Sequence, residues 1–181
     1  QAGALFELTR HLSAEEQAPL KAFSQRYLDA DFMSAPWMYR ARVKPLGYPG
    51  DYEVMNHIYG ERLEGRTLLG QALNYTTLQS PAAAAVRNRK DMMKRELKAL
   101  FDTGEGAFES LSLPSKASVP PVRVLSVASG PAQETFEVLS ELDHLPRPLE
   151  VVLFDQDPGA LAFAYARLKA LADQKFKGQL K

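Results

Sequence analysis

Residues 121–136 read PVRVLSVASGPAQETF, and this stretch decides the fold. Its apolar run at 122–127 predicts a buried β-strand, because short apolar runs bounded by turn residues are typical of strands. A tight turn of small residues follows at 128–130. A helix is then expected to begin at about Pro131, since proline is favoured at the first helical position. Strand, turn and helix in this order are the first half of a βαβ unit.

A second apolar strand follows and ends in an acid. Residues 149–155 read LEVVLFD, so Asp155 lies about 25 residues after Gly130. A nucleotide-binding βαβ unit places an acid roughly 20 residues after its turn, where the carboxylate accepts hydrogen bonds from ribose hydroxyls. The two halves together predict an adenosine-binding site. An ordinary βαβ unit with a tight turn is the alternative.

The composition of the turn indicates the kind of nucleotide. A dinucleotide site requires G-x-G-x-x-G, so that backbone N–H groups approach the diphosphate. Here Gly130 is flanked by Ala128 and Ala132, and Pro131 removes one N–H group from the helix N-terminus. This turn is poor for a diphosphate and acceptable for S-adenosyl-L-methionine, which has no phosphate.

The pattern resembles the first motif of class I methyltransferases, which usually carries an acid where Ser126 stands and a glycine where Ala128 stands. Residues 155–161, DQDPGAL, are similar to their second motif. The resemblance implies a Rossmann-like fold and a set of cofactor-binding residues: Ser126, Ala128, Ser129 and Gly130 at the turn, Glu134, Asp155 and Asp157.

Two of these assignments have structural alternatives. Asp157 is second to Asp155 as a ribose ligand, because it is also placed to cap the following helix. Glu134, one turn into the first helix, either reaches the amino group of the cofactor or is a solvated helix acid.

Composition excludes several classes of protein. The chain has 181 residues, 45% of them hydrophobic and 24% charged, with a net charge of zero and no cysteine. Zero net charge gives no electrostatic argument for nucleic acid. No apolar run reaches the roughly 18 residues that span a bilayer. The absence of cysteine fits a cytoplasmic protein, and no metal-ligand spacing of histidines and acids is present, so no metal is expected.

Helices dominate the first two thirds of the chain. A helix is expected over residues 3 to about 30, with a capping box formed by Ser13 and Glu16. Residues 34–50 are expected to be a loop because of their prolines and glycines. Further helices are expected after Asp51, over residues 67–78, and from the Ser80-Pro81 start to about residue 101. The remaining stretch, residues 102–121, is predicted to be a linker.

These observations predict an α/β fold with two domains. Residues 1–118 form a helical N-terminal substrate or lid region, and residues 119–181 form the first part of the Rossmann-like domain. Two parallel strands and a helix over 157–174 do not bury both faces of a sheet, and parallel sheets are normally covered on both faces. Residues 177–181 are a candidate run-in to a third strand. The chain is therefore expected to need a second chain or a missing C-terminal segment to complete the sheet.

A loop rich in cations and tyrosines precedes the second predicted helix. Residues 44–52 read KPLGYPGDY. Such a loop either folds over a pocket and supplies aromatic walls and a carboxylate, or is a solvent-facing basic loop followed by a helix whose tyrosines cover the core. Tyrosine faces suit a sulfonium cation through cation–π attraction.

The same stretch resembles the K-P-x-G-Y-x-G-D-Y signature of the extracellular factor 3-hydroxypalmitic acid methyl ester biosynthesis family, which are bacterial class I methyltransferases. Residues 87–89, RNR, resemble the basic segment of that family's next helix. The resemblance implies methyl transfer from S-adenosylmethionine to a small-molecule or fatty-acid carboxylate. It suggests catalytic roles for Tyr48, Asp51, Tyr52 and Arg89, and substrate binding by Lys44, Tyr48 and Arg87.

Two other functions remain open at this point. A nucleotide-dependent oxidoreductase is disfavoured by the missing glycines and by Pro131. A non-catalytic or partner-completed binding module is favoured by the missing strands and disfavoured by the GYPGDY segment at 47–52.

Overall fold

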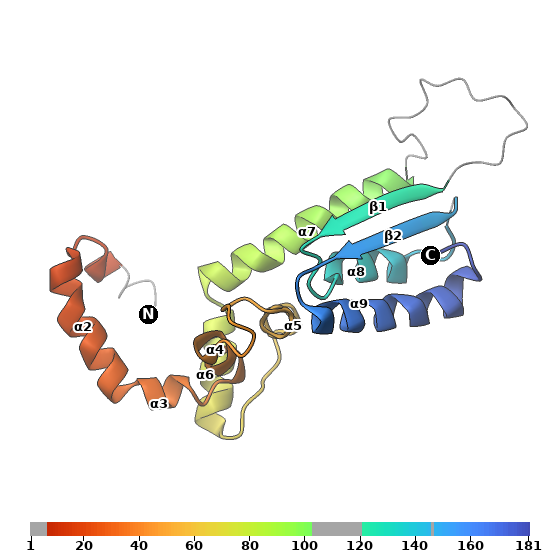
Figure 1. The fold of residues 1–181 in the computed structure, drawn as a ribbon. Coiled ribbons are helices and arrows are strands. Elements are labelled where there is room, and N and C mark those ends of the chain that lie inside the picture. Colours follow the sequence, from red (N-terminus) through yellow and green to blue (C-terminus); the bar gives the residue numbers. More distant parts are fainter. Residues whose placement is uncertain (1–6, 103–120, 146) are drawn as a thin grey trace, which may run out of the picture. The chain divides into compact units, whose positions relative to one another are not determined.

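The computed structural model describes residues 7–102, 121–145 and 147–181 (Figure 1). It combines helices with a two-stranded parallel sheet, which agrees with the predicted α/β class. The chain divides into two compact units, the first comprising Gln1–Pro49 with Glu61–Leu78 and the second Gly50–Gly60 with Gln79–Lys181. The predicted domain boundary between residues 118 and 119 lies outside the described residues, as does most of the predicted linker.

The first unit is helical. Its elements are α2 (Ala14–Tyr27), α3 (Asp29–Phe32), α4 (Pro36–Val43) and α6 (Leu68–Leu78). The predicted capping box is confirmed at the start of α2, where the Ser13 hydroxyl accepts from Glu16 N and the Glu16 carboxylate accepts from Ser13 N. Each of these bonds satisfies a backbone donor that the first helical turn leaves unpaired.

The predicted loop at 34–50 is wrong over its first half, where α4 forms. Pro36 occupies the first turn of α4, a position that needs no N–H donor. The Trp37 indole donates to the Thr77 hydroxyl over 2.8 Å, which ties α4 to α6. The helix ends at Lys44, whose left-handed φ of 52° breaks the helical backbone just before Pro45. Contacts with α6 therefore stabilise a helix that proline and glycine counts argue against.

The second unit contains α5 (Tyr52–Gly60), α7 (Pro81–Asp102), β1 (Val122–Val127), α8 (Gln133–Glu141), β2 (Leu149–Phe154) and α9 (Pro158–Leu171), which continues as a π-helix over Ala172–Phe176. The predicted start of α5 is confirmed, since the Asp51 carboxylate accepts from the N–H groups of Glu53 and Val54, both at 3.0 Å. The Ser80-Pro81 start of α7 is confirmed as well.

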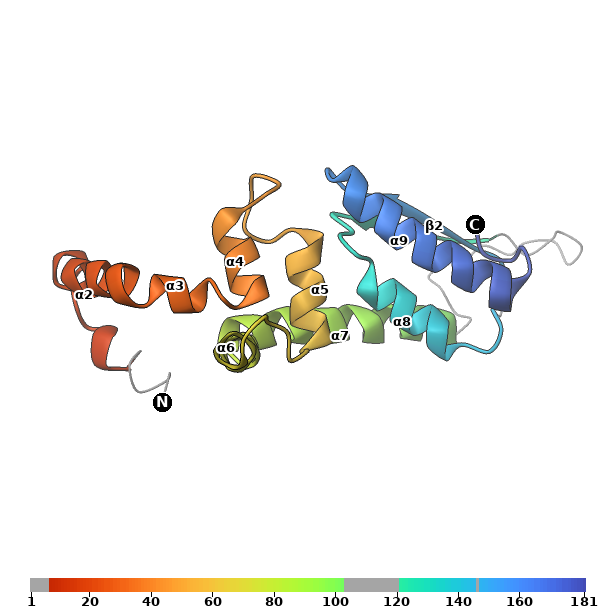
Figure 2. The ribbon, with the colours of Figure 1, turned by 90° about the horizontal axis from the view of Figure 1, so that it is seen from below.

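The two strands are parallel, with Val122 opposite Leu149 and Val127 opposite Phe154. Helices α8 and α9 run along the same side of the sheet in both views (Figures 1 and 2). Side chains at alternate strand positions, such as Val124 and Val151, pack against this side. The buried side chains of the core are Phe101, Ala132, Val138, Leu139, Leu145, Leu149, Ala164, Leu168, Leu171 and Phe176.

The other side chains of the strands form an exposed apolar row. Leu125 and Val127 are 65% and 66% exposed, and Val152 and Phe154 are 47% and 65% exposed. Such exposure is unusual for a parallel sheet, whose two faces are normally covered. None of the helices in the described part of the chain has both the length and the apolar character needed to cross a membrane.

Candidate functional site

The candidate site lies at the carboxyl edge of the sheet. Because β1 and β2 are parallel and end in register, the turn after β1 and the acid after β2 emerge side by side. Ser129 N donates to the Phe154 carbonyl over 3.2 Å, which joins the two strand ends. Ligands of open α/β sheets bind at this edge, outside the carboxyl ends of the strands.

Along the turn after β1, every second residue has a positive φ, which is the left-handed conformation. Ala128, Gly130 and Ala132 have φ values of 54°, 49° and 48°. Left-handed conformations cost a non-glycine residue roughly 1–2 kcal/mol each, so the two alanines hold a strained backbone. Helix α8 therefore begins at Gln133, two residues later than expected from Pro131, because Ala132 is its left-handed N-cap.

Asp155 binds the turn directly. Its Oδ2 accepts from Gly130 N over 2.7 Å, and its Oδ1 accepts from Asp157 N over 3.0 Å. Each carboxylate oxygen has two lone pairs, so both oxygens retain the capacity to accept from a ligand hydroxyl. A Cβ added to Gly130 would meet no atom within 4 Å, so the turn faces open space on that side.

Asp157 caps the following helix, α9, which is the alternative role that the sequence analysis gave it. Its Oδ1 accepts from Gly159 N over 2.8 Å at the start of α9. Its Oδ2 is buried and has no hydrogen-bond partner among the described residues. The hydroxyls of Ser129 and Thr135 are in the same situation. All three residues lie in the segments that follow the two strands, Ser129 and Thr135 after β1 and Asp157 after β2.

Ser126 is the fifth residue of β1, where it pairs with Leu153 and is half buried. It precedes the turn by two residues, within the strand rather than within the group of unpaired atoms.

Helix α5 belongs to the same compact unit as this edge. A Cβ on Gly159 would lie 3.5 Å from Tyr52 Cε1, so the Tyr52 ring rests on the first turn of α9. The Tyr52 ring centroid lies 5.6 Å from that of Phe163, also on α9. Asp51 is fully buried and caps α5. These contacts give both residues a structural task, and the catalytic roles suggested for them stay predictions.

Three side chains, one each from α5, α7 and α8, influence one another's pKa near the start of α8. They are Tyr59, Arg89 and Glu134, and the side chains of Tyr59 and Arg89 are hydrogen-bonded to each other. Burial raises the pKa of Glu134, and the positive charge of Arg89 opposes this effect. Burial likewise raises the pKa of the Tyr59 phenol, with the Glu134 charge adding to it and Arg89 opposing it.

Neighbouring contacts hold the three helices together. Arg87 Nη1 donates to the Ile58 carbonyl over 3.4 Å, which holds the end of α5 on α7. Lys90 Nζ lies 2.9 Å from both carboxylate oxygens of Glu137, which holds α7 on α8. Arg87 thus makes a helix contact, while its predicted role in substrate binding stays a prediction.

Lys44 and Tyr48 belong to the first compact unit. Lys44 ends α4, and Tyr48 is half buried. The second unit contains the other predicted site residues.

Tyr59 and Thr135 are site residues that sequence reasoning missed. The sequence analysis gave Tyr59 no role. Its position seven residues after Tyr52 was an available signal, because residues two helical turns apart share one face. Thr135 has no comparable signal, since only the fold shows that its hydroxyl is buried without a partner.

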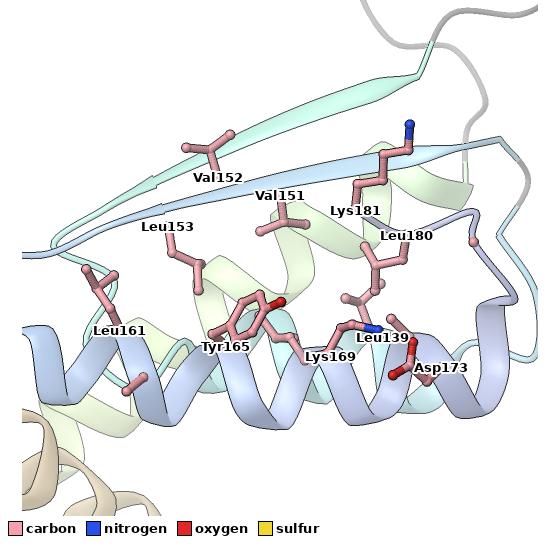
Figure 3. A pocket seen from close by; sticks show the side chains of 14 residues that line it. Leu139, Val151, Val152, Leu153, Leu161, Tyr165, Lys169, Asp173, Leu180 and Lys181 are labelled. Atoms are coloured by element: carbon pink, nitrogen blue, oxygen red, sulfur yellow. Dashed lines mark hydrogen bonds and ion pairs between the residues drawn. The ribbon is translucent and has the colours of Figure 1, made fainter.

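A separate apolar groove of about 780 Å³ lies between α9 and the edge of β2 that faces away from β1 (Figure 3). Leu153 of β2 faces Leu161 and Tyr165 of α9 across it. Leu180 forms a parallel bridge with Leu149, and Val151 N donates to the Lys181 carbonyl over 2.8 Å. Residues 179–181 therefore pair with β2 as the start of a third strand, as the sequence indicated for 177–181.

The described residues form no cluster of metal ligands. Within the described ranges, no three histidines, cysteines or acids lie together in a way that suits a metal ion.

Comparison with known proteins gives no relative. No protein-family model, no curated protein and no solved structure matches the chain. The residues of the site are therefore the only guide to the function.

Proposed function

We propose that the chain is the cofactor-binding part of a Rossmann-like, S-adenosyl-L-methionine-dependent methyltransferase. The observation that carries this proposal is the 2.7 Å hydrogen bond from Gly130 N to Asp155 Oδ2. It joins the small-residue turn and the strand-end acid, which are 25 residues apart in sequence, at the edge where such folds bind adenosine.

The residues of this edge fit the proposed cofactor. The open space beside Gly130 admits a ligand close to the backbone, and Asp155 retains lone pairs for two ribose hydroxyls. Pro131 offers no N–H group and Ala132 is left-handed, so the start of α8 is a poor diphosphate site. This argues against a dinucleotide-dependent oxidoreductase.

The resemblance to the fatty-acid methyl ester family adds the acceptor, a small-molecule or fatty-acid carboxylate. When bound, S-adenosylmethionine supplies an electrophilic methyl group, which a carboxylate oxygen takes while the electrons of the broken C–S bond stay on sulfur. A carboxylate is already ionised at neutral pH, so the protein needs no general base for it. The task of the chain is to align and desolvate the reacting groups, which is worth about 7–11 kcal/mol of barrier.

Cations hold such an acceptor carboxylate through charge-assisted hydrogen bonds. Within the second unit, Arg87 is the cation proposed for this role and Tyr52 the aromatic wall. The substrate-binding roles suggested for Lys44 and Tyr48 rest on the resemblance alone. A cytoplasmic location, expected from the cysteine-free sequence, is part of the same proposal.

A partner-completed binding module is the second candidate. The exposed row of Leu125, Val127, Val152 and Phe154 favours it, together with the open groove beside β2. A second chain or a further segment of this chain that added strands beyond residues 179–181 and covered the row would complete the sheet.

Calorimetric titration with S-adenosylmethionine and S-adenosylhomocysteine tests the proposal. We expect the parent to bind both and Asp155→Asn to weaken binding about 10- to 100-fold, because an amide replaces one acceptor oxygen. Asp143→Asn is the matched control, because Asp143 is exposed and follows the end of α8 that lies away from the turn, so binding should stay within about twofold.

Other outcomes distinguish the alternatives. Saturable binding of a nicotinamide dinucleotide in place of S-adenosylhomocysteine would establish the oxidoreductase. A parent that binds none of these ligands contradicts the proposal for this chain and favours the partner-completed module.

A further inference from the structure

Helix α2 carries a row of large apolar side chains that the described part of the chain leaves open. Leu20, Phe23 and Tyr27 are 50%, 59% and 58% exposed, and none of the residues of α2 is buried there. The ring centroids of Phe23 and Tyr27 lie 4.8 Å apart. Residues three and four apart share one face of a helix, so these three side chains form one stripe, called the α2 stripe below. A helix normally buries such a stripe, so its exposure indicates an interaction surface.

The α2 stripe lies on a different side of α2 from the neighbouring helices of the first unit. Lys21 and Gln25 line a hollow together with Phe32 of α3 and Met38 of α4. Successive residues of a helix are turned by about 100°, so positions 21 and 25 lie on another side of α2 than Leu20. The described helices of the first unit therefore leave the stripe open.

The charges of α2 are separated along its length. The first turn carries Glu15 and Glu16, and the last turn carries Arg26. Glu15 and Arg26 are eleven residues apart, which is about three turns, so they lie along the same side of the helix near its opposite ends. The Arg26 guanidinium lies 5.4 Å from the centroid of the Tyr27 ring, which places its charge at the edge of the stripe. An acidic end and a basic end complement a second α2 that runs in the opposite direction.

We infer that the α2 stripe is the interface of a symmetric homodimer, in which two copies of α2 pack antiparallel through Leu20 and Phe23. Two-fold symmetry places Glu15 of each copy beside Arg26 of the other, so a single arrangement forms two ion pairs. It also sets the opposite ends of the two helix dipoles side by side. Residue 15 then lies opposite residue 26, and the centre of the pair lies between residues 20 and 21. This interface does not depend on the proposed function.

A lipid surface fits α2 less well than a second copy does. Helices that lie on membranes are rich in Lys and Arg on their polar face. Helix α2 has two acids, Glu15 and Glu16, and two bases, Lys21 and Arg26, so its charges cancel. The separation of acids from bases along the helix favours a second α2 instead.

Sedimentation velocity of the whole chain over a range of concentrations tests for the dimer. We expect the parent to dimerise and to dissociate on dilution, because each α2 contributes only three large apolar side chains. Phe23→Asp should weaken dimerisation at least about tenfold, because it places a charge in the interface. Leu68→Asp is the matched control, since Leu68 is 85% exposed at the start of α6 in the same unit, and it should leave dimerisation unchanged. Circular dichroism establishes that each variant is folded.

Charge reversal tests which ends of the two helices meet. Arg26→Glu gives α2 acids at both ends, and Glu15→Arg gives it bases at both ends. Each variant alone should dimerise about three- to tenfold more weakly than the parent, because two attractive pairs become repulsive. An equimolar mixture of the two variants should regain the affinity of the parent, since every acid then faces a base.

The absence of cysteine from the chain allows a direct test of direction. Leu20 lies at the centre of the proposed pair, so Leu20→Cys should form a disulfide between copies under mild oxidation. Tyr27→Cys should not, because its two copies would lie roughly 20 Å apart. A disulfide needs Cα atoms within about 7 Å of each other.

Three results would overturn the inference, and each points to a different explanation. A parent that stays monomeric at all concentrations and binds vesicles of phosphatidylglycerol would assign the stripe to a lipid surface. A dimer that Phe23→Asp leaves intact would place the contact elsewhere, for example on the exposed row of the sheet. Disulfide formation by both cysteine variants would show that the two helices are parallel.

Discussion

Two adjacent parts of the α7–α8 contact use charge in opposite ways. At Lys90, Lys94 and Glu137, each charge meets an opposite one within 3.1 Å. The neighbouring Arg89 and Glu134 form no ion pair among the described residues, and Arg89 is instead hydrogen-bonded to Tyr59. The pKa of Glu137 is lowered, because hydrogen bonds from Gln133, Lys90 and Lys94 outweigh the effect of burial, whereas burial raises the pKa of Glu134. The paired charges hold the two helices together, whereas Glu134 bears the cost of burial without an ion pair among the described residues.

The largest effect is expected where the charges are paired. Glu137→Gln should lower the free energy of unfolding at pH 7 by about 1–2 kcal/mol, between the values typical of exposed and of buried pairs. The side chains of Lys90 and Glu137 are 14% and 23% exposed, which justifies the intermediate value. Urea denaturation measures the difference. An unchanged midpoint would show that this contact does not hold α7 on α8.

The difference in stability between the parent and Glu137→Gln should depend on pH in a definite direction. A carboxyl whose pKa is lower in the folded protein stabilises it above the ordinary value of 4.5, and this contribution is lost as the pH falls through the folded-state value. The difference between the parent and Glu137→Gln should therefore shrink below pH 4.5. A constant difference would contradict the lowered pKa.

A smaller effect of opposite sign is expected for Glu134→Gln. Burial of the carboxylate is unfavourable, and its position in the first turn of α8 offsets part of this cost, about 0.3–1 kcal/mol, through the helix dipole. The variant should gain about 0.5 kcal/mol at pH 7 in urea denaturation. Because the pKa of Glu134 is raised, the gain should disappear as the pH falls through that pKa to below 4.5. A loss of stability at pH 7 would make Glu134 a structural residue.

The smallest effect is expected at the exposed end of the same helix contact. Lys98 lies 3.6 Å from Glu141, and their side chains are 48% and 46% exposed. Lys98→Gln should change the free energy of unfolding by no more than about 0.5 kcal/mol, because solvent screens such pairs. If Lys98→Gln lowered the free energy of unfolding as much as Glu137→Gln, burial would not explain the difference between the two ion pairs.

Sequence reasoning was accurate where neighbouring residues decide the structure. The capping box at Ser13 and Glu16, the Asp51 cap and the Pro81 start are satisfied within four residues of chain. The strands at 122–127 and 149–154 are marked by their own apolar runs. Local reasoning failed at α4, because the contacts that stabilise Trp37 come from α6, about 40 residues further along.

The candidate site divides in the same way. The sequence by itself determined the small-residue turn, the acid that follows β2 and the spacing between them, because these depend on residue type and chain distance. Only the tertiary structure decided that Asp155 accepts from Gly130 and that the hydroxyls of Ser129 and Thr135 are buried without partners among the described residues. It also decided which charges on α7 and α8 are paired, since pairing depends on how two helices pack and not on the order of residues along either one.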